Sequence, residues 1–118
     1  MEGKLTGGRA LSIAAQRYIE AHSAEKFSLQ EMAGALFVNG SYLLRVYKQN
    51  TGMTPLCYHH QLRCEKAKQL LTQTDRSVSG IGEAVGFVSS SHFSHIFKKT
   101  VGCTPSEYRR LYKTFSQR

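Results

Sequence analysis

The chain of 118 residues has no tryptophan and no long apolar run. A membrane-spanning helix needs about 20 consecutive apolar residues, and no stretch of this sequence approaches that length. Helices that lie on a membrane surface carry a broad Lys and Arg face opposite a Trp, Phe and Leu face, and no segment is divided in this way. The N-terminal MEGKLTGG lacks the apolar core of a signal peptide. These absences argue against a membrane protein and indicate a cytoplasmic one.

Cysteine is scarce as well, with Cys57, Cys64 and Cys103 as the three cysteines. Because their number is odd and no CxxC spacing occurs, neither a disulfide framework nor a redox pair is indicated. We expect reduced and mostly buried thiols.

A metal site is an alternative that the histidines raise. The candidate ligands are His92 with His95, His59 with His60, and Cys57 with Cys64. None of these groups has the paired-ligand spacing of a structural zinc site. The two histidines of residues 90–100 are better explained on a helix that faces a partner, so we expect no metal and no cofactor.

Acidic residues are few, since eight Asp and Glu stand against sixteen Lys and Arg, for a net charge of +8 and a pI near 9.7. The sequence contains no GxSxG, HExxH or phosphate-binding glycine loop, and Glu31 and Glu107 are taken up by helix caps. We therefore expect no enzyme. A strong excess of positive charge suits a polyanionic partner such as nucleic acid or an anionic membrane surface.

Helical periodicity runs through the chain, and β-branched residues never alternate over a length that would predict a strand. We expect an all-α fold of seven helices, at residues 10–22, 29–36, 41–50, 55–72, 78–85, 90–100 and 105–112. The sequence predicts capping boxes at Ser28 with Glu31 and at Thr104 with Glu107. Thr54 is expected to cap the fourth helix, with Pro55 as its first residue.

An internal repeat organises these helices. Residues 37–58 read FVNGSYLLRVYKQNTGMTPLCY, and residues 87–108, fifty positions later, read FVSSSHFSHIFKKTVGCTPSEY. Each copy contains a turn, a helix that ends at Gly52 or Gly102, and the start of a further helix. The predicted organisation is a flexible leader or linker remnant at 1–8, lobe one at 9–53, a linker helix at 54–73, lobe two at 76–113 and a tail at 114–118.

Each lobe reads as a helix-turn-helix, in which the second helix lies in the major groove of DNA. The expected inward residues are Tyr42, Leu43, Val46 and Tyr47 in lobe one, and Phe93, Ile96 and Phe97 in lobe two. The predicted base contacts are Ser41, Leu44, Arg45, Ser90, Ser91, Ser94 and His95. The predicted phosphate contacts are Lys48, Thr54, Lys98, Lys99 and Thr104. Taken singly, each Lys is explained equally well as compensation of a helix dipole.

Several segments at matching spacing resemble the C-terminal DNA-binding domain of the AraC/XylS transcription regulators. In lobe two they are residues 85–87, 91–99, 102–105 and 108–109. In lobe one they are residues 41–48 with Gly52, Thr54, Pro55, Tyr58 and Arg63. The resemblance extends from about Leu11 to Tyr112.

The resemblance implies homeodomain-like lobes and a monomeric domain that inserts two recognition helices into successive major grooves of double-stranded promoter DNA. A linker helix of about 27 Å is compatible with groove centres about 34 Å apart. It further implies a bacterial activator that contacts RNA polymerase, and a separate sensor or dimerisation domain outside this chain. Whether the chain is a fragment or a stand-alone regulator stays open, as does a repressor role.

Lobe two departs from the family pattern. His95 stands where Arg is common and His92 where Tyr is common, which weakens guanine reading and suggests pH-sensitive affinity. Gly82 stands where Ala is usual. Two interior glycines and a weak cap at Ser77 predict that residues 78–85 form the least stable helix. The rival interpretation is a non-specific basic adaptor, which would account for the charge but not for the repeat.

Overall fold

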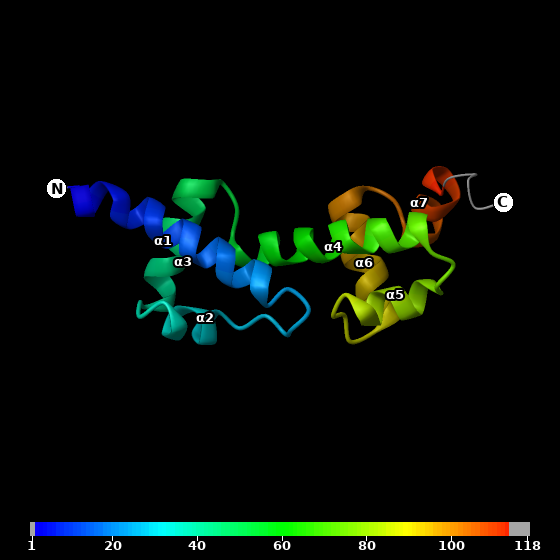
Figure 1. The fold of residues 1–118 in the computed structure, drawn as a ribbon, viewed down its shortest axis with the longest axis horizontal. Helices are drawn as coiled ribbons and strands as arrows, with labels where there is room; N and C mark the ends of the chain where they lie inside the picture. Colours follow the sequence, from blue (N-terminus) through cyan, green and yellow to red (C-terminus); the bar gives the residue numbers. More distant parts are fainter. Residues whose placement is uncertain (1, 114–118) are drawn as a thin grey trace. The chain divides into compact units, whose positions relative to one another are not determined.

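The computed structural model describes the backbone of residues 2–113 and the side chains of residues 8–113. Seven helices account for most of this part of the chain, which contains no β-strand (Figure 1). They are α1 (Glu2–Ala21), α2 (Leu29–Ala35), α3 (Gly40–Thr51), α4 (Pro55–Gln73), α5 (Val78–Ala84), α6 (Ser90–Val101) and α7 (Pro105–Tyr112). The all-α prediction is confirmed. No described helix is both long and apolar enough to cross a membrane.

The helix boundaries agree with the predicted ones to within about one residue, with one exception at the N-terminal end. There α1 begins at Glu2, so residues 2–8 are helical where the sequence predicted an unpatterned leader. Once a helix has formed, each further residue adds a hydrogen bond without a new nucleation step, so the segment can extend beyond its periodic part. The predicted tail at 114–118 lies outside the described residues.

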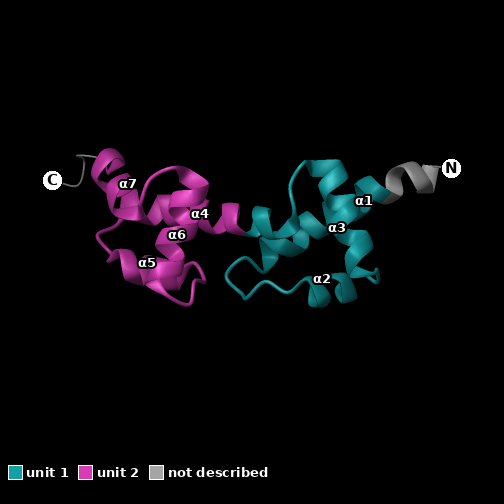
Figure 2. Cartoon of the chain, turned by 180° about the vertical axis from the view of Figure 1, so that it is seen from behind, with its two compact units in different colours: residues 1–59 teal, residues 60–118 magenta. Residues whose placement is uncertain are grey.

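The chain divides into two units, which we call unit 1 (Met1–His59) and unit 2 (His60–Arg118) (Figure 2). In unit 1, α3 packs against α1 and α2. In unit 2, α6 packs against α5 and α7. The first turn of α4 belongs to unit 1 and the remainder of α4 to unit 2.

The core of unit 1 is built from α1, α2 and α3. Its buried apolar residues are Ala15, Ile19, Met32, Ala33, Leu43, Val46 and Tyr47. Burial raises the pKa of Tyr47 to about 12, because the ionised phenolate would be poorly solvated there. The Tyr47 hydroxyl therefore stays protonated and acts as part of the core.

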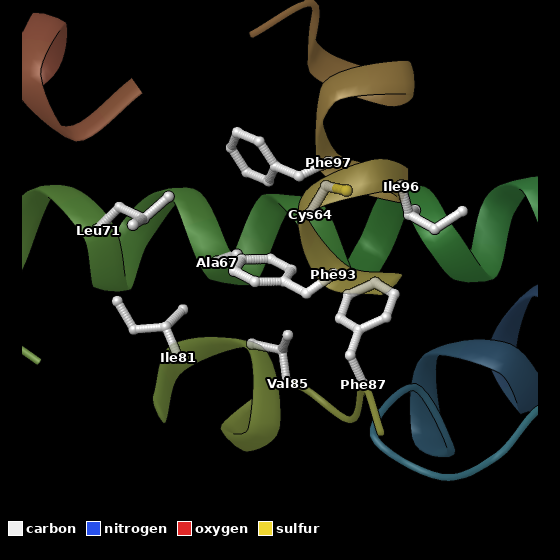
Figure 3. Close-up of a cluster of buried hydrophobic side chains, with 9 residues drawn as sticks. All are labelled: Cys64, Ala67, Leu71, Ile81, Val85, Phe87, Phe93, Ile96 and Phe97. Carbon is white, nitrogen blue, oxygen red and sulfur yellow. The ribbon is translucent and has the colours of Figure 1, made fainter. Parts of the chain in front are cut away.

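The core of unit 2 forms where α5, α6 and α4 meet, and Figure 3 shows its side chains converging between these helices. The buried members are Cys64, Ala67, Leu71, Ile81, Val85, Phe87, Phe93, Ile96 and Phe97. Rings from α6 and the preceding turn contact one another, with 5.3 Å between the centroids of Phe87 and Phe93 and 5.7 Å between those of Phe93 and Phe97. The aromatic rings thus fill the centre of unit 2.

Close approach between α5 and α6 explains one departure from the family pattern. A Cβ atom placed on Gly82 would lie 2.6 Å from Cδ2 of Phe93, so no larger residue fits without movement. In unit 1, Ala33 on α2 corresponds to Gly82, and Leu43 on α3 corresponds to Phe93. Both are buried. Compared with unit 1, unit 2 has a smaller residue on its first helix-turn-helix helix, α5, and a larger one on α6. This glycine makes room for the Phe93 ring, and the prediction that α5 is the least stable helix stays a prediction.

The turns of the two lobes differ by one residue. In unit 1 the Val38 amide donates to the Ala33 carbonyl oxygen and Asn39 caps α3 directly afterwards. In unit 2 the Phe87 amide donates to the Gly82 carbonyl oxygen, and Val88 then intervenes before the Ser89 cap.

Aligning the two copies of the repeat by their sequence therefore pairs residues of the two turns that are not structurally equivalent. Phe37 is 93% exposed with φ of 60°, whereas Phe87 is 4% exposed. Phe37 corresponds structurally to Gly86, which also has a positive φ. Val38 corresponds to Phe87.

The predicted caps are formed with one difference. At α7 both halves of the capping box are present, because Thr104 and Glu107 each accept the backbone amide of the other. At α2 only the half in which Ser28 Oγ accepts the Glu31 amide is formed in the described structure. The Ser77 hydroxyl accepts the Gly80 amide at 2.9 Å, so the cap of α5 is better made than predicted.

A side chain that follows each recognition helix secures the end of the first helix of its unit. His59 Nε2 donates to the Glu25 carbonyl oxygen at 3.1 Å, just beyond α1. Arg109 donates to the carbonyl oxygens of Leu71 at 3.0 Å and Thr74 at 3.1 Å, at the end of α4. Carbonyls at a helix C-terminus lack partners within the helix, so Arg109 supplies donors at the end of α4, while His59 holds the chain that follows α1. Arg109 thus has a structural role within the described unit.

Candidate nucleic-acid interface

The outward face of α3 carries most of the residues predicted to read DNA in unit 1. An Asn39 cap starts the helix, since its Oδ1 accepts the amides of Ser41 and Tyr42. Leu43, Val46 and Tyr47 then turn inward and are buried. The opposite face exposes Ser41, Leu44, Arg45 and Lys48, as predicted.

Tyr42 lies on the exposed side of α3, and the prediction that it points inward is wrong. Its side chain is 42% exposed, beside Leu44 at 38%. The guanidinium carbon of Arg45 lies 5.2 Å from the centre of the Tyr42 ring. The sequence predicts a core position for this ring because several apolar residues occur in a row at the start of the helix. The signal for the other interpretation was Arg45 three residues later on the same face.

The outward face of α6 carries the corresponding residues of unit 2. The Ser89 hydroxyl accepts the His92 amide at 3.0 Å and starts the helix, and Phe93, Ile96 and Phe97 are buried as predicted. The structure leaves exposed the predicted contact residues Ser90, Ser91, His95, Lys98 and Lys99. Ser94 is half-buried and is therefore less accessible than Ser90 and Ser91.

An aromatic and imidazole cluster lies at the start of α6. His92 meets the Phe87 ring edge-on at 5.4 Å between centroids and the His60 ring at 6.3 Å. The guanidinium of the buried Arg63 lies 5.0 Å from the centre of Phe87. Burial, and then the charges of His92, Arg63 and Lys99, hold the pKa of His60 below its usual value. At neutral pH His60 is therefore uncharged.

Lysines occupy the last turns of both recognition helices. Lys48 lies in the last turn of α3, and Lys98 with Lys99 lies in that of α6. The carbonyl oxygens of Lys48 and Lys98 accept the amides of Gly52 and Gly102, both in the left-handed conformation. The exposed ammonium groups complement the negative end of each helix dipole and remain accessible to a phosphate.

The starts of α4 and α7 are electrostatically different. At α4 the Thr54 hydroxyl accepts the Cys57 amide, and the first turn contains no acidic residue. At α7 the Glu107 carboxylate accepts the Thr104 amide, and these bonds with Thr104 hold the pKa of Glu107 below its usual value. An ionised carboxylate there repels a phosphate. The start of α4 is thus the better of the two predicted anion sites.

The cysteines occupy three different environments, with Cys64 buried, Cys103 half-buried and Cys57 exposed. Burial raises the pKa of the Cys64 thiol, so that it remains protonated in the core of unit 2. Within the described residues, no three His, Cys, Asp or Glu side chains lie together in a way that could hold a metal ion.

Comparison with known proteins matches this arrangement to a family. The model of the helix-turn-helix domain family matches residues 32–111. The RhaS transcriptional activator of Escherichia fergusonii is 39% identical over 93 residues, covering 79% of this chain and 34% of RhaS. The chain thus spans about a third of the length of this curated relative.

Two solved structures have the same fold. The C-terminal domain of AraT, a response regulator from Geobacillus stearothermophilus, superposes with a TM-score of 0.84 and is 33% identical, covering 88% of this chain and 87% of that one. The DNA-binding domain of AdpA, solved in complex with a target DNA, has a TM-score of 0.76 and is 25% identical, covering 92% of this chain and 95% of that one. With the duplicated helix-turn-helix and its exposed basic faces, these likenesses show that the chain belongs to the AraC/XylS family of transcription regulators, as a DNA-binding domain.

Proposed function

We propose that the chain recognises a specific double-stranded DNA sequence by inserting α3 and α6 into successive major grooves. The observation that carries this proposal is the equivalence of the two helices. Each has 12 residues, a side-chain cap at its start, and a buried apolar face opposite an exposed polar and basic one. An α-helix of this kind fits the major groove, where each base pair presents a distinct pattern of hydrogen-bonding groups.

The proposed contacts divide into two classes. On α3, Arg45 donates to guanine O6 and N7, Leu44 packs on a thymine methyl group and Ser41 bonds a base edge. On α6, His95 and the serines Ser90, Ser91 and Ser94 read base edges. The phosphate contacts are Lys48, Lys98, Lys99 and the start of α4 at Thr54, with Thr104 weaker because Glu107 lies beside it.

Unit 1 supplies most of the sequence discrimination in this proposal. Arg45 is the one exposed arginine on the two recognition helices, and α6 presents His95 at the same place in its sequence. A bidentate arginine–guanine pair distinguishes one base from the others by about 1–3 kcal/mol. Unit 2 contributes more of its affinity through phosphate contacts, which fix the register without specifying the sequence.

The likeness to the RhaS activator supports a role in activating transcription, in which the bound domain contacts RNA polymerase. Since the chain spans about a third of that relative, we also propose a separate sensor or dimerisation domain in the whole regulator. The isolated chain then acts as a monomer in the cytoplasm. Its role is binding and not catalysis.

Selection of bound sequences from a random duplex library, with this chain at near-physiological salt, tests the proposal. The expected result is two short conserved blocks one helical turn apart, favoured over random DNA by about a thousandfold or more. A single block would restrict base reading to one helix. Recovery of no motif, together with binding that disappears steeply with added salt, would contradict sequence reading and leave a non-specific basic adaptor.

A further inference from the structure

The side chain of Arg45 has a contact that the base-reading proposal does not itself require. Its guanidinium carbon lies 5.2 Å from the centre of the Tyr42 ring, one turn earlier on the exposed face of α3. Within the described residues, Arg45 makes no hydrogen bond and no ion pair with another side chain. Among the described residues, the Tyr42 ring is therefore the partner that the structure gives this guanidinium.

Such a contact matters because a long side chain loses rotational freedom when it binds. An arginine that is mobile in the free protein must be ordered on the DNA, and this ordering lowers affinity. A cation over an aromatic face is attracted by the ring, and a guanidinium can stack there while its five N–H donors, which lie in its own plane, stay available. An ion pair with a carboxylate would have used those donors instead.

We propose that Tyr42 is a positioning residue, which holds the Arg45 guanidinium stacked and ordered so that its free donors meet a guanine edge. This inference rests on the proposed base-reading role of Arg45 and names the residue that makes it effective. It also explains why a tyrosine 42% exposed lies beside the recognition face when the neighbouring Leu43 is fully buried.

The same arrangement is not repeated on α6. There His92 and His95 occupy the corresponding places, and the ring of His92 meets Phe87 and His60 at the rim of the core. The other two cation–ring contacts of the described residues pair Arg63 and Lys68, both on α4, with Phe87 and Tyr108. Within residues 8–113, a basic side chain lies over an aromatic ring on the exposed face of a recognition helix at Arg45 and Tyr42 of α3.

The test is a set of variants measured on the duplex selected from the random library and on versions changed at the guanine that Arg45 reads. Tyr42→Leu removes the aromatic face and is expected to weaken binding about 3- to 10-fold, with an equal loss of discrimination at that base pair. Tyr42→Phe keeps the face and should stay within about twofold of the unchanged chain. In an Arg45→Ala background, Tyr42→Leu should have no further effect, because the two residues act as one unit.

Tyr112→Leu is the matched control, since it makes the same change at an exposed tyrosine on α7 and should leave discrimination unchanged. Thermal unfolding of every variant shows whether α3 is still folded, and Tyr42→Met, which suits a helix, replaces Tyr42→Leu if that variant unfolds. In the free protein, the Nε–H group of Arg45 should show a higher NMR order parameter than that of the exposed Arg17, and Tyr42→Leu should remove this difference.

The outcomes separate the two proposals. If Arg45→Ala abolishes discrimination and Tyr42→Leu does not alter it, the positioning role is wrong and base reading by Arg45 stands. A loss with Tyr42→Phe as large as that with Tyr42→Leu would also overturn it, because the hydroxyl and not the ring face would then be responsible. If Arg45→Ala leaves discrimination intact, base reading by Arg45 itself fails.

Discussion

At Phe37 a bulky side chain occupies the left-handed backbone region that glycine adopts most easily. Its φ is 60° and its ring is 93% exposed, so the strain is not offset by packing. Gly86 occupies the corresponding place in the other turn. The left-handed conformation costs an L-residue about 1–2 kcal/mol, and the greater flexibility of an unfolded glycine offsets part of that difference. Phe37→Gly should therefore raise the free energy of unfolding by about 0.5–1 kcal/mol, measured by urea denaturation.

Val88→Gly provides the control for that prediction. Val88 is 92% exposed in the other turn, but its φ is not in the positive region. A glycine there gains nothing in the folded state and adds freedom to the unfolded chain. It should destabilise the protein slightly, and an equal stabilisation by both changes would show that strain at Phe37 is not the cause.

Arg45 and Lys98 should separate specificity from general affinity. Arg45→Ala is expected to cost about 1–3 kcal/mol on the selected site and to relax discrimination at one base pair. Lys98→Ala should weaken binding to all duplexes alike and reduce the slope of log affinity against log salt by about one unit. Fluorescence anisotropy titrations over a range of salt concentrations measure both quantities. A uniform loss of affinity with Arg45→Ala would exclude a base-reading role.

The sizes of the side chains at corresponding positions differ between the helix pairs of the two units. In unit 2 Gly82 on α5 lies against the large Phe93 on α6, and the corresponding positions of unit 1 hold Ala33 on α2 and Leu43 on α3, both buried. Gly82→Ala gains helix propensity but forces a Cβ to 2.6 Å from the Phe93 ring. Overpacking of this kind costs about 1–3 kcal/mol, so the variant should unfold at a lower urea concentration than the unchanged chain.

The double variant Gly82→Ala with Phe93→Leu reproduces the unit 1 pairing in unit 2. It should be more stable than the sum of the two single changes predicts, since the alanine methyl group fills part of the space that the ring leaves. A double-variant cycle of urea denaturation measurements gives the coupling directly. Additive effects would mean that the two positions do not share the same space.

The helices could be predicted closely from the sequence because their caps and C-terminal glycines are local signals. The Thr104 box and the ends of α3 and α6 at Gly52 and Gly102 depend only on neighbouring residues. Other features depend on tertiary packing. The extra Val88 in the second turn shifts Phe87 into the core while Phe37 stays exposed, and the repeated letters FV conceal this shift.

The same division between local signals and tertiary packing applies to the candidate site. Helical periodicity correctly predicts that Arg45, Lys48 and His95 face outward, because they lie opposite the apolar positions of their helices. Periodicity cannot distinguish a ring that enters the core from one that lies at its edge, and Tyr42 is at the edge. The close approach of the Phe93 ring to Gly82 likewise cannot be predicted from the sequence of α5 alone, because Phe93 comes from another helix.

For the molecule as a whole, net charge and histidine titration make stability depend on pH. The chain already carries +8 at pH 7, and the partly buried His60 faces His92 on α6, with the charges of Arg63 and Lys99 also acting on it. Its folded pKa lies below the ordinary value of 6.5, so between the two the unfolded state binds more protons. The His60 contribution to stability is therefore fully present above about pH 6.5 and is lost as the pH falls from that value through the lower pKa of the folded state.

Urea denaturation at pH 7.5 and 5.5 tests this dependence. The unchanged chain should lose stability on acidification, and His60→Gln, which cannot be protonated, should lose less. His95→Gln, at an exposed position of the same unit, provides the comparison. An equal loss in the unchanged chain and in His60→Gln would assign the pH dependence to other groups.

The size matching between Gly82 and Phe93 limits how this domain can be recombined. A chimera that received α3 in place of α6 would set Leu43 against Gly82 and leave a void, and the reverse exchange would press Phe93 against Ala33. A new DNA-sequence preference is therefore better introduced by transferring two packed helices together, either α2 and α3 or α5 and α6. Over generations of gene duplication and divergence, these helix pairs and not single helices would be the units that can be shuffled between regulators.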